Sequence, residues 1–263
     1  MVDWIYSNPT WLWGTVLVAT ITAIACGGLV LFHNHVNVEI RRKHNDVAAA
    51  TMAIVGIAYA VLIAFIAVAT WEAFGAADKI VDSEASAIGN LYRDTTGLSP
   101  DKAEPMKADI KKYLHEVIND EWPTQQHGEA KPLARPTLLH LHALVAHVDP
   151  QTAGEQVIMA ELLDDLNELF NARRTRILSS GGAIPEIVWW IVALGTVVTV
   201  FFTYLFGSHD FRMHLTMTGL TAASMGLVIV LIVSLDRPFR GDLSVSTEAY
   251  HAIEDAIAEA EKG

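Results

Sequence analysis

Four long apolar stretches dominate the pattern of hydrophobic and polar positions along the chain. They run from Trp11 to Phe32, Val47 to Trp71, Pro185 to Phe206 and Leu215 to Leu235, and their interiors carry no charge. A membrane-spanning helix needs about 20 mostly apolar residues, and each stretch reaches that length. Tryptophans lie near several of their ends, as is typical of a membrane interface. The pattern predicts an all-α integral membrane protein with four transmembrane helices.

The polar segment between the second and third stretches predicts a soluble α-helical domain. Ser99 followed by Pro100 is typical of a helix start, and Leu162, Leu166 and Leu169 recur at helical spacing. We therefore divide the chain into transmembrane helices 1 and 2 (residues 1–75), the soluble domain (76–182), transmembrane helices 3 and 4 (183–236) and an acidic carboxyl-terminal tail (237–263).

The second stretch carries a stripe of small residues on one side of its predicted helix. At 100° per residue, one narrow stripe contains Ala49, Ala53, Gly56, Ala60, Ala64 and Ala67. Small residues let helices approach closely, so one interpretation is packing within the protomer, with a partner in the fourth stretch at Gly219, Ala222, Ala223 and Gly226. The other interpretation is a pore lining, in which several protomers place this stripe around a common axis.

Acidic residues flank this helix. Asp46 lies within the stripe at one end, and Glu72 lies at the other end, about a third of a turn away. Rings of carboxylates at both mouths of a pore would favour cations. The alternatives are a helix cap for Asp46 and a solvated interfacial charge for Glu72.

The distribution of basic residues predicts an orientation in the membrane. The short connection 33–46 holds Arg41, Arg42 and Lys43, whereas the amino-terminal tail has no Lys or Arg. By the positive-inside rule this connection is cytoplasmic, and both termini and the middle domain face outward. The first stretch is long enough to span and lacks a basic leading region and a cleavage site, so we expect it to be retained.

Composition removes several classes of function. The net charge of −12 argues against a nucleic-acid partner, and no catalytic motif is present, so we expect neither an enzyme nor a bound cofactor. The lone Cys26 excludes a disulfide framework. His33, His35 and His209 lie on two short connections that share one membrane face and are weak candidates for a metal site, although their spacing matches no ligand motif.

Further charged residues have a structural interpretation. Three arginines precede the third stretch, namely Arg173, Arg174 and Arg176. They are expected to pair with Glu72, Asp78 or Glu84 on the helix that continues the second stretch, and contact with lipid headgroups is the alternative. Asp236 closes the fourth stretch and is expected to pair with Arg237 or another arginine on the same side.

Three segments together resemble the bestrophin-like family of bacterial membrane proteins, a domain of unknown function. They are Ile57 to Phe65 leading to Trp71 and Glu72, Glu84 with Leu91 to Arg93, and Leu235 to Gly241 with its Asp-Arg-Pro-Phe sequence. The resemblance implies kinship with bestrophins, oligomeric anion channels whose second span lines the pore and whose domain and termini are cytoplasmic. The chain lacks the acidic run of the bestrophin calcium clasp and the Ile, Pro and Phe neck pattern, so its own carboxylates favour cations.

Two functions follow as hypotheses. The first is a homo-oligomeric ion channel or pore in a bacterial cytoplasmic membrane, which passes small inorganic cations along its second span. The alternative is a non-conducting sensor or scaffold, anchored in the lipid bilayer, whose acidic helical domain binds a partner.

Overall fold

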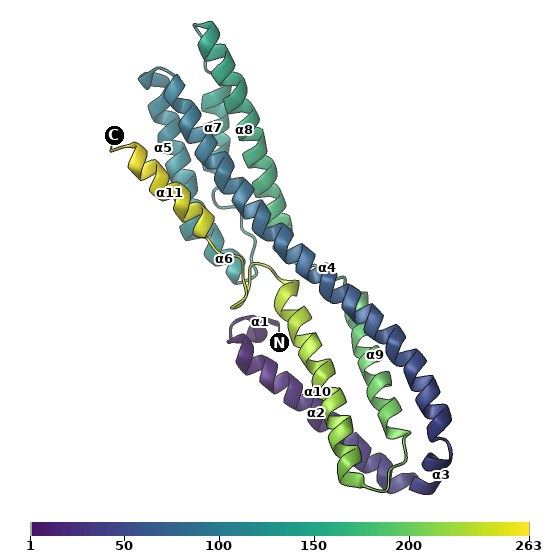
Figure 1. Cartoon of the computed structure of the whole chain (residues 1–263). Helices are drawn as coiled ribbons and strands as arrows, with labels where there is room; N and C mark the ends of the chain where they lie inside the picture. Colours follow the sequence, from purple (N-terminus) through teal and green to yellow (C-terminus); the bar gives the residue numbers. More distant parts are fainter. Residues whose placement is uncertain (1, 263) are drawn as a thin grey trace. The chain divides into compact units, whose positions relative to one another are not determined.

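A computed structural model describes residues 2–262, and the part of the chain that it describes is built from helices (Figure 1). The chain divides into two compact units. The membrane unit comprises residues 1–73, 182–236 and 241–243, and the helical unit comprises residues 74–181, 237–240 and 244–263. One long helix, α4 (Asn45–Asp94), contributes residues to both units.

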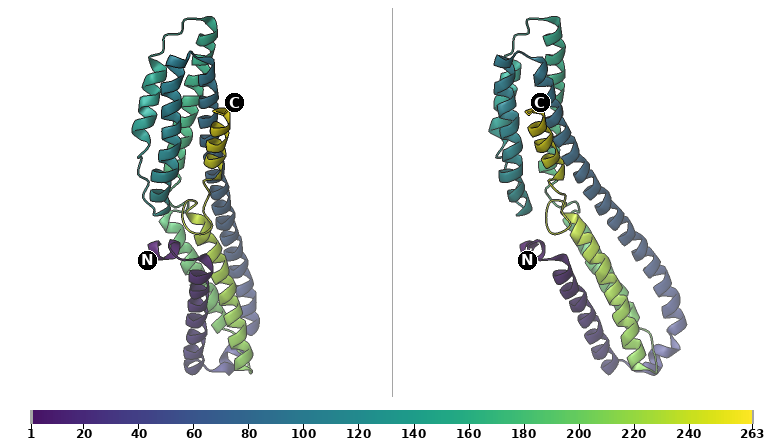
Figure 2. Two further views of the ribbon diagram at one scale, coloured as in Figure 1. Left: turned by 90° about the vertical axis from the view of Figure 1, so that its left-hand side faces the viewer. Right: turned by 60° about the vertical axis from the view of Figure 1, so that its left-hand side comes forward.

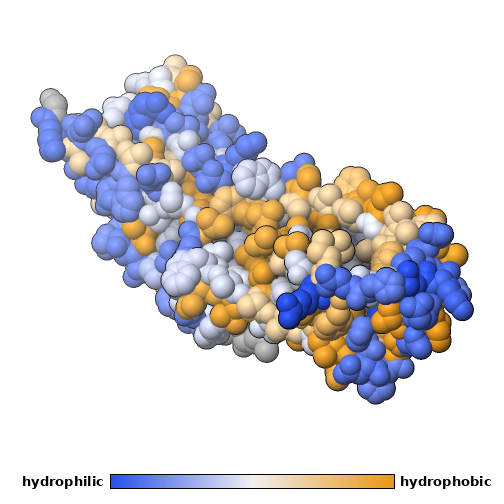
Figure 3. All heavy atoms as spheres, turned by 60° about the horizontal axis from the view of Figure 1, so that its bottom comes forward, coloured by the Kyte–Doolittle hydropathy of each residue, from blue (hydrophilic) through white to orange (hydrophobic). Residues whose placement is uncertain are grey.

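Four helices of the described chain are long and apolar enough to cross a membrane, which confirms the four predicted spans. They are α2 (Thr10–His35), the first part of α4, α9 (Glu186–Tyr204) and α10 (Phe211–Asp236). Only 11% to 33% of the most apolar window of each is buried within the chain. Hydrophobic side chains consequently gather on the outer surface of this unit (Figure 3). Exposure of so much apolar surface is stable only when lipid replaces water.

The short connections of the membrane unit are fixed by polar contacts to backbone. Helix α3 (Val38–Lys43) begins where the side chain of Asn37 accepts a hydrogen bond from the backbone N–H of Glu39 at 2.8 Å. Arg41 is buried and donates to the carbonyl oxygens of Tyr204 and Phe206, at 3.1 and 3.3 Å. This arginine therefore satisfies carbonyl groups at the carboxyl end of α9, where a positive charge is favourable.

Small residues of α10 pack against α2, not against α4. A Cβ added to Gly226 would lie 3.2 Å from Val18, and one added to Gly219 would lie 3.4 Å from the sulfur of Cys26. Ala222, between them, is fully buried with Ala25 of α2. Figure 2 shows α2 and α10 side by side along their lengths. The predicted pairing of this seam with the second span is therefore wrong, because the first span occupies it.

Helix α4 packs on α9 through one tyrosine. The hydroxyl of Tyr59 donates to the carbonyl oxygen of Val192 at 2.8 Å and lies 2.7 Å from the hydroxyl of Thr196. Its ring covers Gly195, where an added Cβ would lie only 2.1 Å from a ring carbon. Ile63 and Ile232 complete this buried contact. The inward-facing side of α4 is thus the side of Tyr59 and Ile63.

The helical unit is a bundle around one hydrophobic core. Its elements besides the end of α4 are the 3₁₀ turn η1 (Thr95–Gly97), α5 (Pro100–Glu116), the π-helical turn η2 (Val117–Glu121), α6 (Trp122–Gln126), α7 (Arg135–Ala146), α8 (Ala153–Leu178) and α11 (Glu248–Ala260). The predicted helix start at Ser99 and Pro100 is confirmed, and α8 begins where the Thr152 hydroxyl accepts from the N–H of Glu155 at 3.1 Å. Leu162, Leu166 and Leu169 are buried in the core.

The carboxyl-terminal segment belongs mostly to the helical unit and does not form a separate tail. Trp122 makes edge-to-face contacts with Phe239 and Tyr250, at ring-centre distances of 5.5 and 5.8 Å. One side of α11 is buried in the core of the helical unit through Tyr250 and Ile257. Residues 241–243 instead join the membrane unit, where Asp242 accepts a hydrogen bond from the N–H of Thr10 at 2.7 Å. The amphipathic pattern of α11 explains why it packs although its net charge is acidic.

Candidate functional site: the small face of α4 and a buried charge cluster

The stripe of small residues on α4, here called the small face, lies on the surface of the single chain. Its members are Ala49, Ala53, Gly56, Ala60, Ala64 and Ala67. Four of them are exposed, and Gly56 and Ala67 are half-buried. A Cβ added to Gly56 would meet no atom within 4 Å. Packing inside the protomer therefore leaves most of this face uncovered, in contrast to the small residues of α10.

Three sectors divide the circumference of α4 within the membrane unit. Tyr59 and Ile63 face the rest of the protomer and are buried. Large apolar side chains such as Val61 and Phe65, which are 50% and 71% exposed, form a second sector suited to lipid. The small face is the third sector. Small side chains are of no advantage against lipid, whereas they allow close approach of another helix or widen a path beside the backbone.

The two acidic residues at the ends of this helix lie on different sectors. Asp46 precedes Ala53 by seven residues, about two turns, so it shares the small face. Glu72 follows Phe65 by seven residues and therefore shares the large apolar sector. Both carboxylates are exposed. Of the two carboxylates, Asp46 is therefore the one that lies at an end of the small face.

The helical unit holds a buried cluster of two carboxylates and two guanidinium groups. The Nε and Nη2 atoms of Arg176 donate to the two carboxylate oxygens of Glu84, at 2.6 and 3.1 Å. Nη2 also donates to Oε2 of Glu121 at 2.8 Å, and Arg173 donates to Oε1 of Glu121 at 2.5 Å. All four side chains are at most 8% exposed. The charges balance within the cluster, which makes their burial tolerable.

Neutral groups complete the hydrogen bonding of the cluster. The hydroxyl of Tyr113 donates to Oε1 of Glu84 at 2.7 Å, and the N–H of Ala134 donates to Oε1 of Glu121 at 2.8 Å. Gln125 accepts from Nη1 of Arg176 and donates to the hydroxyl of Ser180 at 2.7 Å. The cluster thus joins α4, α5, the π-helical turn, α6 and α8.

The cluster also shifts the titration of the groups around it. Burial raises the pKa of Tyr113 and of Tyr250 well above the usual range, and the nearby Glu84 carboxylate raises both further. Burial on its own lowers the pKa of Arg176, but Glu84 and the two tyrosines outweigh it, so the net shift is strongly upward. The guanidinium of Arg176 therefore stays charged over the whole physiological pH range.

The residues predicted to form structural pairs have different surroundings. Arg173 and Glu84 both belong to the cluster, whereas Arg174 is exposed. The carboxylate of Asp236 accepts a hydrogen bond from the N–H of Ile184 at 2.9 Å, just before α9 begins. Arg237, which follows α10, is half-buried.

Sequence reasoning missed the roles of Glu121, Gln125 and Tyr113, whereas it included Arg176 among the arginines expected to pair with Glu84. The helical period gives a further signal for Arg176. It follows Leu169 by seven residues, about two turns, so it lies on the buried side of α8, while Arg174 does not. The carboxylate of Glu121 carries no comparable local signal, because its two arginine partners lie more than 50 residues away.

Two of the three histidines proposed as metal ligands have other partners. The Nδ1 atom of His33 lies 2.9 Å from Nη2 of Arg41, and Nδ1 of His35 lies 2.8 Å from the carbonyl oxygen of Leu31 in its own helix. His209 is exposed on the connection between α9 and α10. Among the described residues, no three His, Cys, Asp or Glu side chains are grouped so that they could hold a metal ion. The weak metal hypothesis therefore loses its geometric basis.

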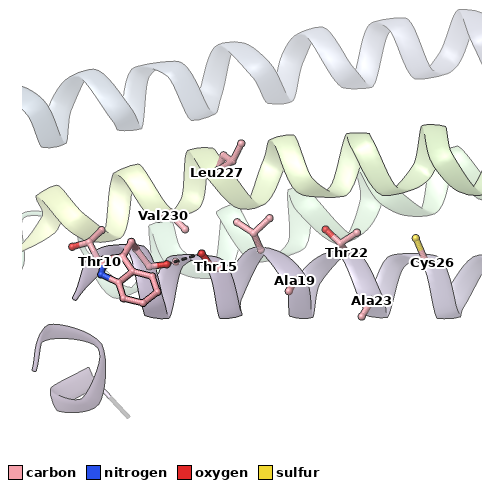
Figure 4. Close-up of a pocket in the computed structure, with 11 residues that line it drawn as sticks. Thr10, Thr15, Ala19, Thr22, Ala23, Cys26, Leu227 and Val230 are labelled. Carbon is pink, nitrogen blue, oxygen red and sulfur yellow. Dashed lines mark hydrogen bonds between the residues drawn. The ribbon is translucent and has the colours of Figure 1, made fainter. Parts of the chain in front are cut away.

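A groove of about 660 Å³ lies between α2 and α10 in the membrane unit. It is almost entirely apolar, with Thr15, Ala19 and Ala23 of α2 opposite Leu227 and Val230 of α10 (Figure 4). The hydroxyl of Thr15 donates to the carbonyl oxygen of Trp11 at 2.6 Å, within its own helix. The groove therefore offers surface for lipid chains but no charged group that would take part in ion transfer.

Comparison with known proteins assigns the family. The sequence pattern of the Bestrophin-like domain matches residues 19–250, so the chain belongs to the Bestrophin-like family. No curated protein matches the sequence.

Solved structures share the fold. Two variants of a bacterial bestrophin homologue from Klebsiella pneumoniae align with a TM-score of 0.67 at 12% and 13% identity, over 92% of this chain and 99% and 98% of theirs. A crystal structure described as a membrane protein aligns with a TM-score of 0.64 at 14% identity, over 94% of this chain and 97% of that one. This protein is therefore a four-span membrane protein with the bestrophin fold.

Proposed function

We propose that this protein is a homo-oligomeric ion channel whose α4 helices line the path and which conducts small cations. The observation that carries the proposal is the exposed small face of α4. Nothing within the described part of the chain covers Gly56, although the comparable seam on α10 is filled by α2. Several protomers that turn this face toward one axis would give a path lined by identical rings. Family membership and the shared fold support the same proposal.

The preference for cations rests on Asp46. This carboxylate is exposed and lies on the small face at the end of the helix. Repetition around an axis would place a ring of negative charge at that mouth, which attracts cations and repels anions. Glu72 lies on the neighbouring sector and would add to the negative potential near the opposite mouth without lining it.

The test is an ion-flux measurement on the purified oligomer in planar bilayers with a KCl gradient. The wild-type protein is expected to show a reversal potential close to the equilibrium potential of K⁺. Asp46→Lys is expected to shift the reversal potential toward the equilibrium potential of Cl⁻. Glu39→Lys is the matched control, because Glu39 is an exposed carboxylate on the same connection but on α3.

Two outcomes contradict parts of the proposal. Silent bilayers with a well-folded oligomer would exclude a channel and favour the scaffold hypothesis, as would a monomer in detergent. Current with an anion reversal potential that Asp46→Lys leaves unchanged would keep the channel but remove the assigned selectivity.

A further inference from the structure

A second groove, of about 430 Å³, lies on the surface of the membrane unit between α2 and α9, and we call it the α2–α9 groove. Its lining is almost entirely apolar and includes the exposed side chains of Ile24 and Val197. At one end Tyr204 lines it, and the hydroxyl of Tyr204 donates to the carbonyl oxygen of Ala25 at 2.7 Å. A groove of this kind on a membrane-spanning unit suits a hydrocarbon chain, because a polar ligand would lose its hydrogen bonds there.

Aromatic rings connect this end of the groove to a buried arginine. Phe201 and Tyr204 line the groove, and the ring of Phe32 lies against both, at ring-centre distances of 5.8 and 5.9 Å. The guanidinium of Arg41 lies over the ring of Phe32, 5.7 Å from its centre. Arg41 belongs to α3, in the connection between the first two spans, and such connections lie at the level of the lipid headgroups.

The positive charge of Arg41 forms no ion pair with a carboxylate of the described chain. The side chain is only 4% exposed. Nη1 donates to two carbonyl oxygens at the end of α9, and Nη2 lies 2.9 Å from Nδ1 of His33. A helix end supplies only about half of an elementary negative charge, so these acceptors balance the guanidinium in part. The acidic residue of α3, Glu39, pairs with Arg42 instead, at 3.3 Å.

One donor of Arg41 is also left over. Its Nε atom is buried and has no hydrogen-bond acceptor in the described part of the chain. A buried guanidinium that lacks both a full negative charge and one acceptor is unfavourable unless an anion supplies them. The arrangement therefore indicates an anionic ligand that reaches Arg41 from outside the chain.

We infer that Arg41 and the α2–α9 groove together bind an anionic phospholipid, with one acyl chain in the groove and the headgroup phosphate on the guanidinium. A phosphate oxygen accepts from Nε and supplies the missing negative charge. The exposed cation Lys43 on the same helix adds a weaker attraction for anionic lipid. This site is separate from the small face of α4 and does not rest on the proposed ion path.

The first experiment tests the headgroup. Native mass spectrometry of the purified full-length protein in detergent measures the lipid retained from an equimolar mixture of phosphatidylglycerol and phosphatidylcholine. The wild type is expected to retain about fivefold more phosphatidylglycerol, the effect of one basic residue on anionic lipid. Arg41→Gln is expected to abolish this preference. Lys43→Gln is the control and is expected to keep most of it, because Lys43 is exposed.

The second experiment tests the acyl chain with two adjacent residues of α9. Ala193 lines the groove, whereas Leu194 is 65% exposed on the surface of the same helix and does not line it. Ala193→Trp places an indole in the groove and is expected to abolish the retention of phosphatidylglycerol. Leu194→Trp adds an indole beside the groove and is expected to leave the retention unchanged. If Arg41→Gln does not fold, this pair decides.

Four results would overturn the inference. They are equal retention of the two lipids by the wild type, a preference that is lost in Lys43→Gln but kept in Arg41→Gln, equal retention by the two α9 variants, and a changed oligomeric state in Ala193→Trp alone. The last would show that a second copy of the chain covers the groove. Inorganic phosphate is the remaining arm: if it raises the unfolding temperature as much as phosphatidylglycerol does, Arg41 binds a free anion and the lipid site is excluded. No readout requires ion current, so this site and the proposed channel can fail independently.

Discussion

The Nε atom of Arg176 lies 2.6 Å from Oε2 of Glu84. Arg176 lies near the end of α8, and Glu84 lies in the second half of α4. Both side chains are fully buried. The two residues are 92 positions apart in the sequence, and the segment between them includes α5, α6 and α7, which contribute to the hydrophobic core of the helical unit. This ion pair therefore fixes the helix that continues the second span within the helical unit.

Replacement of Arg176 by Met is expected to destabilise the helical unit strongly. Glu84 and Glu121 would each lose a guanidinium partner while they remain buried, a change that typically costs about 3–5 kcal/mol. Arg174→Met is the control, since Arg174 is exposed, and its effect is expected within about 0.5 kcal/mol. Denaturant unfolding in detergent, followed by tryptophan fluorescence, measures both. Equal effects of the two variants would contradict a structural role for the cluster.

The raised pKa of Tyr113 predicts a loss of stability at high pH. The unfolded tyrosine loses its proton near pH 10, whereas the buried one keeps it to a higher pH. The folded state then binds more protons than the unfolded state, so stability is complete below about pH 10 and falls as the pH rises further. In Tyr113→Phe the fall above about pH 10 should be shallower.

The measurement for Tyr113 is the unfolding midpoint as a function of pH, with wild type and variant compared in the same buffer series. Absorbance titration of the tyrosines provides an independent readout, since a buried group contributes only after unfolding. Identical slopes for the two proteins would show that Tyr113 titrates as an ordinary exposed tyrosine.

Gly195 is expected to tolerate no side chain while Tyr59 is present. The added Cβ in Gly195→Ala would lie 2.1 Å from a Tyr59 ring carbon, so α4 and α9 must separate, at a typical cost of about 1–3 kcal/mol. Gly27→Ala is the control, because an added Cβ there meets no atom within 4 Å. Thermal unfolding in detergent measures the difference. A Tyr59→Ala background should relieve most of the effect, and no relief would mean that the clash lies elsewhere.

The positive charges of the chain and its resemblance to bestrophins predict opposite orientations in the membrane. The basic connection 33–46 predicts that both termini face outward, although buried Arg41 already uses its charge to satisfy carbonyls of α9. Carboxyl-terminal fusions to alkaline phosphatase should then be active and those to green fluorescent protein dark, and fusions after His209 should show the opposite. The reverse pattern in both fusions would place the helical unit in the cytoplasm, as in bestrophins.

The sequence by itself determined the four spans, the helical middle domain and the stripe of small residues on the second span. These features depend on apolar transfer and on the period of the helix, which are properties of neighbouring residues. The resemblance through the Asp-Arg-Pro-Phe segment also pointed to the family that the domain match shows.

Only the tertiary structure decided which helix fills which seam. Gly219 and Gly226 meet α2, although their small size alone suits α4 equally well. Glu121 finds Arg173 and Arg176 only because the bundle brings distant segments together, and no local pattern specifies such a pairing. The tertiary structure also decided that the small face of α4 is exposed, and this exposure is what makes the small face a candidate lining of an ion path.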